Sequence, residues 1–169
     1  MADFAIQRIA MVESQLRPNE VFDRRLIGAM RALPRENFVP PRLREVAYID
    51  DALEVFPSID GAPARFLLAP MVLARLIQLA SVEPQDSVLD IGCATGYSTA
   101  VLAGLARSVV GLEAEPELAE AARGALRELA ISNAEVLTGA LAEGHTTGLG
   151  AKGESVCPAG KGADGVGGE

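Results

Sequence analysis

Short apolar runs alternate with helical periodicity along the middle of the chain. Three runs have the length and branched aliphatic content of buried strands: Val88–Ile91, Val109–Glu113 and Glu135–Thr138. Stretches with apolar positions at helical spacing begin at Pro70, before the first run, and at Thr99 and Pro116, between the runs. Because helices separate the strands, the pattern predicts parallel strands joined by helical crossovers, which is an α/β fold.

Helical periodicity also marks the chain before the first of these strands. The apolar faces are expected to consist of Ala5, Ile9, Val12 and Leu16, then Phe22, Leu26, Met30 and Leu33, then Val72, Leu73, Leu76, Leu79 and Ala80. Pro34–Pro41 is expected to be an extended, proline-bounded link. These helices are predicted to be packing elements.

The turn between the first predicted strand and its helix carries the main chemical signal. Gly92 and Gly96 can adopt backbone angles closed to other residues, and they let a ligand approach the backbone closely. The helix that follows directs its free N–H groups and positive dipole end toward that ligand. The turn therefore predicts a ligand with a carboxylate or phosphate group.

The spacing Asp90-x-Gly92-x-Ala94-x-Gly96 differs from the G-x-G-x-x-G dinucleotide fingerprint. It resembles motif I of the S-adenosylmethionine-dependent class I methyltransferases. That resemblance implies that the methionine end of the cofactor is held by Asp90 and the loop residues Gly92, Cys93, Ala94, Thr95, Gly96 and Tyr97. About twenty residues on, Glu113 ends the second predicted strand, where a carboxylate can accept two hydrogen bonds from a ribose diol. The simpler alternative is a tight turn and a solvated strand end.

A more specific resemblance extends from about residue 8 to residue 145. Met11–Leu16, Pro34–Pro40, Ala47–Asp50 and Val88–Ala103 look like segments of the protein-L-isoaspartate O-methyltransferases, in the same order. The resemblance implies a Rossmann-like class I methyltransferase fold, here incomplete, with N-terminal helices and about three parallel strands. It also implies a protein-repair enzyme that methylates the carboxylate of isoaspartyl residues in damaged proteins or peptides.

Two departures from that family affect the expected site. The family has Thr-Ile-Ser-Gln-Pro where this chain has Phe66–Pro70, so Leu68 replaces the serine beside the acceptor carboxylate and no catalytic residue can be named. Near the end of the third strand the family has Gly-Asp-Gly, and Ala140 and Leu141 follow Gly139 here. One adenine contact is thereby lost. Arg65 could pair with an acceptor carboxylate, although a solvated surface arginine is the simpler interpretation.

Composition narrows the class of protein. The 169 residues are 49% hydrophobic and only 4% aromatic, and the net charge of −8 argues against a nucleic-acid partner. No apolar run is long enough to span a bilayer, and one histidine with two cysteines makes a zinc site improbable. The small number of cysteines favours a cytoplasmic location.

The composition changes after residue 143. We expect an N-terminal helical, substrate-side region at 1–80, a cofactor-binding half at 81–143, and a glycine-rich disordered tail at 144–169. The family continues with at least four more strands, so truncation or a shifted reading frame near His145 is expected. An open sheet edge and uncovered apolar faces should result.

Three functions remain open from the sequence. The first is a carboxyl methyltransferase of the protein-repair type, which needs no catalytic base because its acceptor is already ionised at pH 7. The second is a cofactor-binding chain without turnover, favoured by Leu68 and Ala140, and the third is a nicotinamide-dependent oxidoreductase, disfavoured by the loop spacing. Binding of S-adenosylmethionine and NADH, and methylation of isoaspartyl peptides, discriminate among them. Cys93 as a nucleophile lacks a neighbouring histidine and is not favoured.

Overall fold

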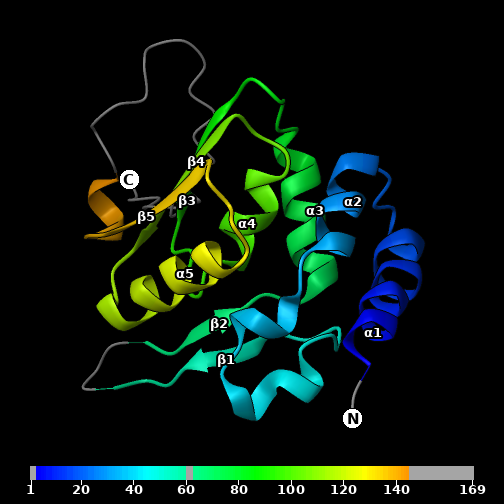
Figure 1. Cartoon of the computed structure of the whole chain (residues 1–169), viewed down its shortest axis with the longest axis horizontal. Helices are drawn as coiled ribbons and strands as arrows, with labels where there is room; N and C mark the ends of the chain where they lie inside the picture. The colour runs from blue at the N-terminus through cyan, green and yellow to red at the C-terminus, as the bar shows by residue number, and fades with distance from the viewer. Residues whose placement is uncertain (1–2, 60–62, 145–169) are drawn as a thin grey trace, which may run out of the picture.

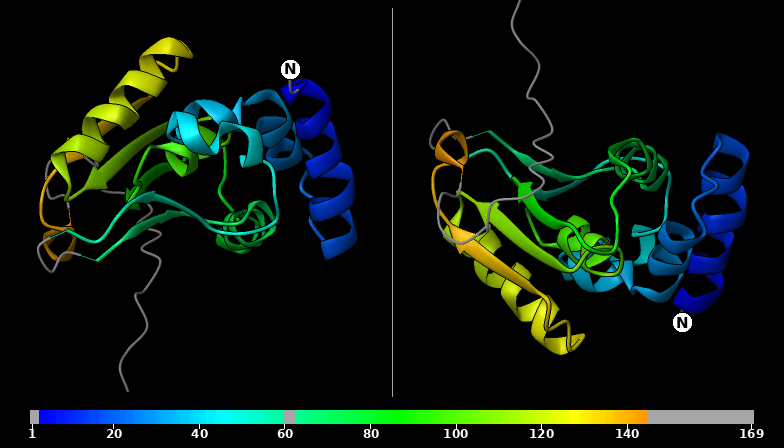
Figure 2. Two further views of the ribbon diagram at one scale, coloured as in Figure 1. Left: turned by 90° about the horizontal axis from the view of Figure 1, so that it is seen from below. Right: turned by 90° about the horizontal axis from the view of Figure 1, so that it is seen from above.

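Two sheets of different type organise the chain (Figure 1). The computed structural model describes residues 3–59 and 63–144. Within these residues, a parallel sheet has the order β3-β4-β5, and β1 pairs with β2 in an antiparallel hairpin. Figure 2 shows the parallel sheet between α5 on one side and the β1–β2 hairpin on the other. The predicted α/β fold class is confirmed.

The strands are β1 Leu53–Phe56, β2 Arg65–Leu67, β3 Ser87–Ile91, β4 Ser108–Glu113 and β5 Ala134–Thr138. The α-helices are α1 Phe4–Met11, α2 Arg24–Ala32, α3 Pro70–Ala80, α4 Tyr97–Ala103 and α5 Pro116–Glu128. A π-helical segment covers Val12–Leu16, and short 3₁₀ turns cover Arg17–Asn19, Arg35–Phe38, Pro41–Val46 and Leu141–Glu143. The three parallel strands and α5 lie within a residue or two of their predicted positions.

The register of the parallel sheet places the ends of its strands side by side. Asp90 of β3 is opposite Gly111 of β4, and Glu113 of β4 is opposite Thr138 of β5. Helices α4 and α5 pack against β4 and β5. The carboxyl ends of parallel strands form one edge, which is where α/β folds bind ligands.

The N-terminal helices bury part of the predicted faces, since Val12, Leu16, Leu26 and Met30 are buried as predicted. Met11 and Leu16 are buried, whereas Ala5 and Ile9 are exposed, because α1 continues into a π-helical turn that changes the helical phase. Phe22 is also exposed. Pro34–Pro41 is not an extended link, since most of it forms 3₁₀ turns.

Helix α3 starts at Pro70 as predicted, but it packs with another face. Its buried residues are Pro70, Leu73, Ala74 and Ile77, while Val72, Leu76 and Leu79 are exposed. Among the described residues, Phe66, Leu68 and Ile91 are also exposed apolar side chains. One cluster of buried side chains nevertheless extends from the N-terminal helices through α3 to α4 and α5.

The predicted disordered tail lies outside the described residues, apart from Gly144. None of the described helices combines the length and apolar character needed to cross a bilayer.

Gly96 and Gly124 provide a matched pair for testing the glycine loop. Gly96 has φ +89°, and a Cβ there would lie 2.9 Å from Ala122 Cβ, so Gly96→Ala should lower the free energy of unfolding by about 3 kcal/mol. Gly124 lies inside α5 with no atom within 4 Å of its Cβ position, so Gly124→Ala should raise it by about 0.5–1 kcal/mol. Urea unfolding of both variants checks this. Equal effects would contradict the close packing of the loop on α5.

Candidate functional site

The predicted donor site is assembled at the carboxyl ends of β3 and β4. Asp90 precedes the last residue of β3, Glu113 ends β4, and the loop from Gly92 to Gly96 lies between β3 and α4. The Ala94 N–H donates to Glu113 Oε2 at 2.7 Å, so the loop and the second carboxylate are directly joined. The structure therefore brings together the residues on which the sequence prediction depended.

The loop turns through unusual backbone angles. Gly92, Ala94 and Gly96 have φ values of +79°, +48° and +89°. Glycine adopts such angles without strain, whereas Ala94 costs free energy there. The hydrogen bond from its N–H to Glu113 helps to hold Ala94 in this conformation. Because Ala94 is held in a left-handed backbone conformation that costs free energy, the loop is a candidate functional site.

Glu113 is a fully buried carboxylate with five hydrogen-bond donors. Ala114 N–H and Glu115 N–H donate to Oε1 at 2.9 and 3.1 Å, in addition to Ala94 N–H on Oε2. The Arg65 guanidinium completes the set, with Nη1 2.6 Å from Oε1 and Nη2 2.9 Å from Oε2. Glu113 is not the solvated strand end of the simpler interpretation, because its side chain is 0% exposed.

Asp90 is bonded on one oxygen only. The hydroxyls of Ser98 and Thr99 both donate to Oδ2 at 2.7 Å, and no protein donor among the described residues reaches Oδ1. Burial raises the pKa of Asp90, and the Glu113 charge adds to this, while the two hydroxyls act in the opposite direction. Asp90 thus keeps one acceptor for a ligand.

The loop's own donors are mostly used within the protein. Gly92 N–H and Cys93 N–H donate to Leu112 O, and Gly96 N–H donates to Cys93 O. The Thr95 hydroxyl donates to Phe38 O at 2.6 Å. These atoms hold the loop in place, and they are not free to bind an anion as the motif had suggested.

Cys93 and Tyr97 belong to the core. Burial, with Asp90 nearby, raises the pKa of the Cys93 thiol to about 12, so the thiol is protonated and unsuited to nucleophilic attack. The Tyr97 ring is fully buried, with Arg35 4.8 Å above its centre and Phe38 against its edge. Only the backbone of Tyr97 remains near the loop surface for a ligand.

Of the remaining predicted residues, Leu141 is the one that the structure places against the loop. Leu141 lies beside it, since its Cδ1 is 3.8 Å from the position of a Cβ on Gly92, whereas Ala140 is exposed. The Leu68 side chain is 40% exposed, and its carbonyl accepts a 2.7 Å hydrogen bond from the buried Arg35 guanidinium. Leu68 therefore has no side-chain hydroxyl that could bind the carboxylate of a methyl acceptor.

Arg65 is the site residue whose position sequence reasoning missed. It lies on β2, 48 residues before Glu113, and its side chain is only 16% exposed. It is neither a solvated arginine nor free to bind an acceptor. In the sequence, Arg65 directly precedes Phe66–Pro70, the segment that corresponds to the acceptor side of the family. No local pattern indicates that Arg65 pairs with Glu113.

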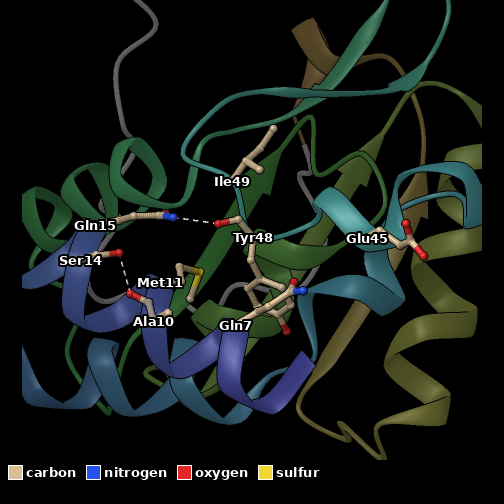
Figure 3. Close-up of a pocket in the computed structure, with 8 residues that line it drawn as sticks. All are labelled: Gln7, Ala10, Met11, Ser14, Gln15, Glu45, Tyr48 and Ile49. Carbon is tan, nitrogen blue, oxygen red and sulfur yellow. Dashed lines mark hydrogen bonds between the residues drawn. The ribbon is translucent and has the colours of Figure 1, made fainter. Parts of the chain in front are cut away.

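The cavity in Figure 3 lies in another part of the molecule. Its volume is about 260 Å³, and it lies between the N-terminal helical segment and the turn around Tyr48. The lining side chains are Gln7, Ala10, Met11, Ser14, Gln15, Glu45, Tyr48 and Ile49. None of the predicted donor-site residues lines it.

Comparisons with known proteins agree with this geometry. The sequence matches the family model of protein-L-isoaspartate(D-aspartate) O-methyltransferases over residues 7–148. It is 36% identical over 144 residues to the protein-L-isoaspartate O-methyltransferase of Koribacter versatilis, covering 85% of this chain and 62% of the relative. The corresponding protein of Herpetosiphon aurantiacus is 38% identical over 141 residues, with 83% and 60% covered. The chain thus spans about three fifths of the length of these relatives.

Solved structures show the same fold. A protein-L-isoaspartate O-methyltransferase superposes with a TM-score of 0.70 at 24% identity, covering 82% of this chain and 44% of that one. A Plasmodium falciparum protein described under the same family name, solved in complex with S-adenosyl-L-homocysteine, gives a TM-score of 0.61 at 20% identity, with 77% and 62% covered. The extent of the family match and the identity to curated relatives lead to one conclusion: the chain belongs to the protein-L-isoaspartate(D-aspartate) O-methyltransferase family.

Proposed function

We propose that this chain binds S-adenosylmethionine at the carboxyl ends of β3 and β4 and methylates isoaspartyl carboxylates in proteins. The observation that carries the proposal is the junction of Asp90, the glycine loop and Glu113 through the Ala94 N–H. Two carboxylates on neighbouring strand ends suit a ligand with an ammonium group at one end and a ribose diol at the other. Family membership supports the same cofactor.

The residues present fit this cofactor by the chemistry of their acceptors. Asp90 Oδ1 accepts no hydrogen bond from the part of the chain that the structure describes, and it can accept from the ammonium group of the methionine end. Glu113 ends β4 where a ribose diol would lie, with its two oxygens bonded to five protein donors in this structure. Leu141 beside Gly92 would provide an apolar contact for the adenine. Ala140 adds no polar group there. The backbone of Gly92–Tyr97 shapes the wall of the site.

When bound, S-adenosylmethionine would supply a methyl group on a positively charged sulfur. An acceptor carboxylate oxygen would bond to the methyl carbon as the sulfur–methyl bond breaks, which gives the methyl ester and S-adenosyl-L-homocysteine. The chain's own task is to hold the two reactants in line and to exclude water, and such positioning accounts for about 7–11 kcal/mol of a barrier. An isoaspartyl carboxylate is ionised at pH 7 and requires no general base. The thiol of Cys93 has no role in this chemistry.

The acceptor side gives rise to a second candidate function. Leu68 occupies the position of the family serine and offers only its backbone, whose carbonyl is already bonded to Arg35. A chain that binds the cofactor without turnover is therefore the alternative, and methylation of an isoaspartyl peptide separates it from the first proposal. Incorporation of methyl groups from labelled S-adenosylmethionine at saturating peptide supports the enzyme, and its absence together with cofactor binding supports the alternative.

The proposal extends to partners and location. The partners are damaged proteins or peptides that carry isoaspartyl residues, in keeping with the family. We also propose a cytoplasmic location, because the sequence has only two cysteines and Cys93 is a free, buried thiol.

Binding of S-adenosyl-L-homocysteine should depend on the ionisation of Asp90. Because burial raises the pKa of Asp90 above the usual 3.8, the ionised form that attracts the ligand's ammonium group is lost as the pH falls from neutral. Affinity should therefore decrease toward pH 5 in isothermal titration. Asp90→Asn should weaken binding at pH 7.5 by about tenfold or more and abolish this slope.

Glu117→Gln serves as the control for that experiment, because Glu117 is an exposed carboxylate in the first turn of α5. It should retain both the affinity and the pH slope. Unchanged binding by Asp90→Asn would remove Asp90 from the donor site.

Restoring a hydroxyl at position 68 should improve methyl transfer. Leu68→Ser adds a donor at the family's serine position, and one hydrogen bond of about 1 kcal/mol corresponds to roughly a fivefold increase in kcat/KM for an isoaspartyl peptide. The loss of packing should be small because the side chain is 40% exposed. Leu76→Ser, an exposed leucine on α3, is the matched control and should leave the rate unchanged. No gain at position 68 would show that the acceptor is bound differently here.

A further inference from the structure

Arg65 and Glu113 form a bidentate ion pair in the proposed donor site. The guanidinium donates Nη1 to Oε1 at 2.6 Å and Nη2 to Oε2 at 2.9 Å. The Glu113 side chain is 0% exposed and that of Arg65 16% exposed. This geometry is the strong, parallel form of arginine–carboxylate pairing, so the contact is specific to these two groups.

Glu113 has no acceptor capacity left while this pair exists. Oε1 already accepts from Arg65, Ala114 and Glu115, and Oε2 accepts from Arg65 and Ala94. Five donors already exceed the roughly four lone-pair sites of a carboxylate, so the two hydroxyls of a diol can bind only in the positions that the two Arg65 N–H groups occupy, one on each oxygen. A ribose diol therefore cannot bind to Glu113 in addition to these five donors.

The two Arg65 N–H groups correspond in number to the two hydroxyls of a ribose diol. Three of the five donors on Glu113 are backbone N–H groups of the loop and of the β4 end, which are fixed by the fold. Among the described residues, Arg65 is the only side-chain donor to Glu113. It is thus the group that must leave when a diol binds.

The hairpin sets Arg65 over the loop. The register between β1 and β2 shifts between Glu54 and Phe56, directly opposite Arg65, and such irregularities redirect a side chain near functional sites. Arg65 Nη2 lies 3.2 Å from the position of a Cβ on Gly92. The guanidinium therefore covers the same loop surface that the cofactor would need.

We propose that Arg65 is a latch that closes the donor site by occupying the diol-binding face of Glu113, and that S-adenosylmethionine binds only after displacing it. This inference rests on the proposed function of the site. Only molecules in which Arg65 has left Glu113 can bind the ligand. The apparent dissociation constant therefore equals the intrinsic dissociation constant divided by the fraction of such molecules. The ribose and Arg65 thus compete for one carboxylate.

Graded substitution of Arg65 tests the latch. Arg65→Met keeps an apolar stem over the loop without the guanidinium, and it should tighten S-adenosyl-L-homocysteine binding by about tenfold, as expected for an open form populated at about 10%. Arg65→Lys keeps the charge but cannot form two parallel bonds, so its affinity should lie between those of Met and wild type. Isothermal titration of the full chain at pH 7.5 gives the dissociation constants.

Matched variants and ligands separate competition from a general structural effect. Arg75→Ala removes an arginine that bonds Asn19 and Glu20 on the surface, and it should leave the affinity unchanged. The 2′,3′-dideoxy analogue of S-adenosyl-L-homocysteine has no diol to displace Arg65, so Arg65→Met should improve its binding much less. Thermal unfolding of each variant identifies any loss of folded protein.

A spectroscopic measurement follows Arg65 itself. In the free protein labelled with ¹⁵N-arginine, the paired guanidinium should give separate, slowly exchanging Nη–H signals, which are assigned by their loss in Arg65→Met. Saturating S-adenosyl-L-homocysteine should abolish these signals. Persistence of the signals in the complex, or equal affinities of Arg65→Met and wild type, would overturn the latch and leave the proposed function intact. Absence of binding by every variant would instead overturn the donor site.

Discussion

The structure depends on how a single buried charge, the Glu113 carboxylate, is neutralised. A carboxylate removed from water is strongly destabilising unless it is paired and hydrogen-bonded. Here the compensation comes from three parts of the chain: the loop after β3, the residues after β4, and Arg65 on β2. Glu113 thus connects the sheet, the loop and the hairpin at one point.

The loop is fixed from its other side by the N-terminal region. The Thr95 hydroxyl donates to Phe38 O, and the Tyr97 ring packs between Phe38 and the buried Arg35. Burial lowers the pKa of the Arg35 guanidinium, and its bonds to the carbonyls of Ala47 and Leu68 compensate for the lost hydration. The segments before β3 thus support the loop from Gly92 to Gly96, which explains why they form one core with the sheet.

Local patterns were sufficient to predict the parallel sheet, because each strand is a short apolar run followed by a helix with its own start signal. They could not assign the buried face of α3, since this helix is apolar on two sides and only the packing favours Leu73 and Ile77 over Val72 and Leu76. The loop and Glu113 were recognisable from their spacing. The Arg65 contact was not, because a pairing across 48 residues with no periodic signal is decided by tertiary structure alone.

Arg65 also connects the two halves of the proposed reaction. It lies three residues before Leu68, on the strand that leads into α3, while its guanidinium reaches the end of β4. The same short segment is held at Leu68 O by Arg35, which packs on Tyr97 at the start of α4. Displacement of Arg65 by a ligand, as proposed above, would remove the contact that joins this segment to the end of β4. Arg35 and Arg65 thus hold the three-residue strand β2 and the residue that follows it from two sides, in addition to the pairing of β2 with β1.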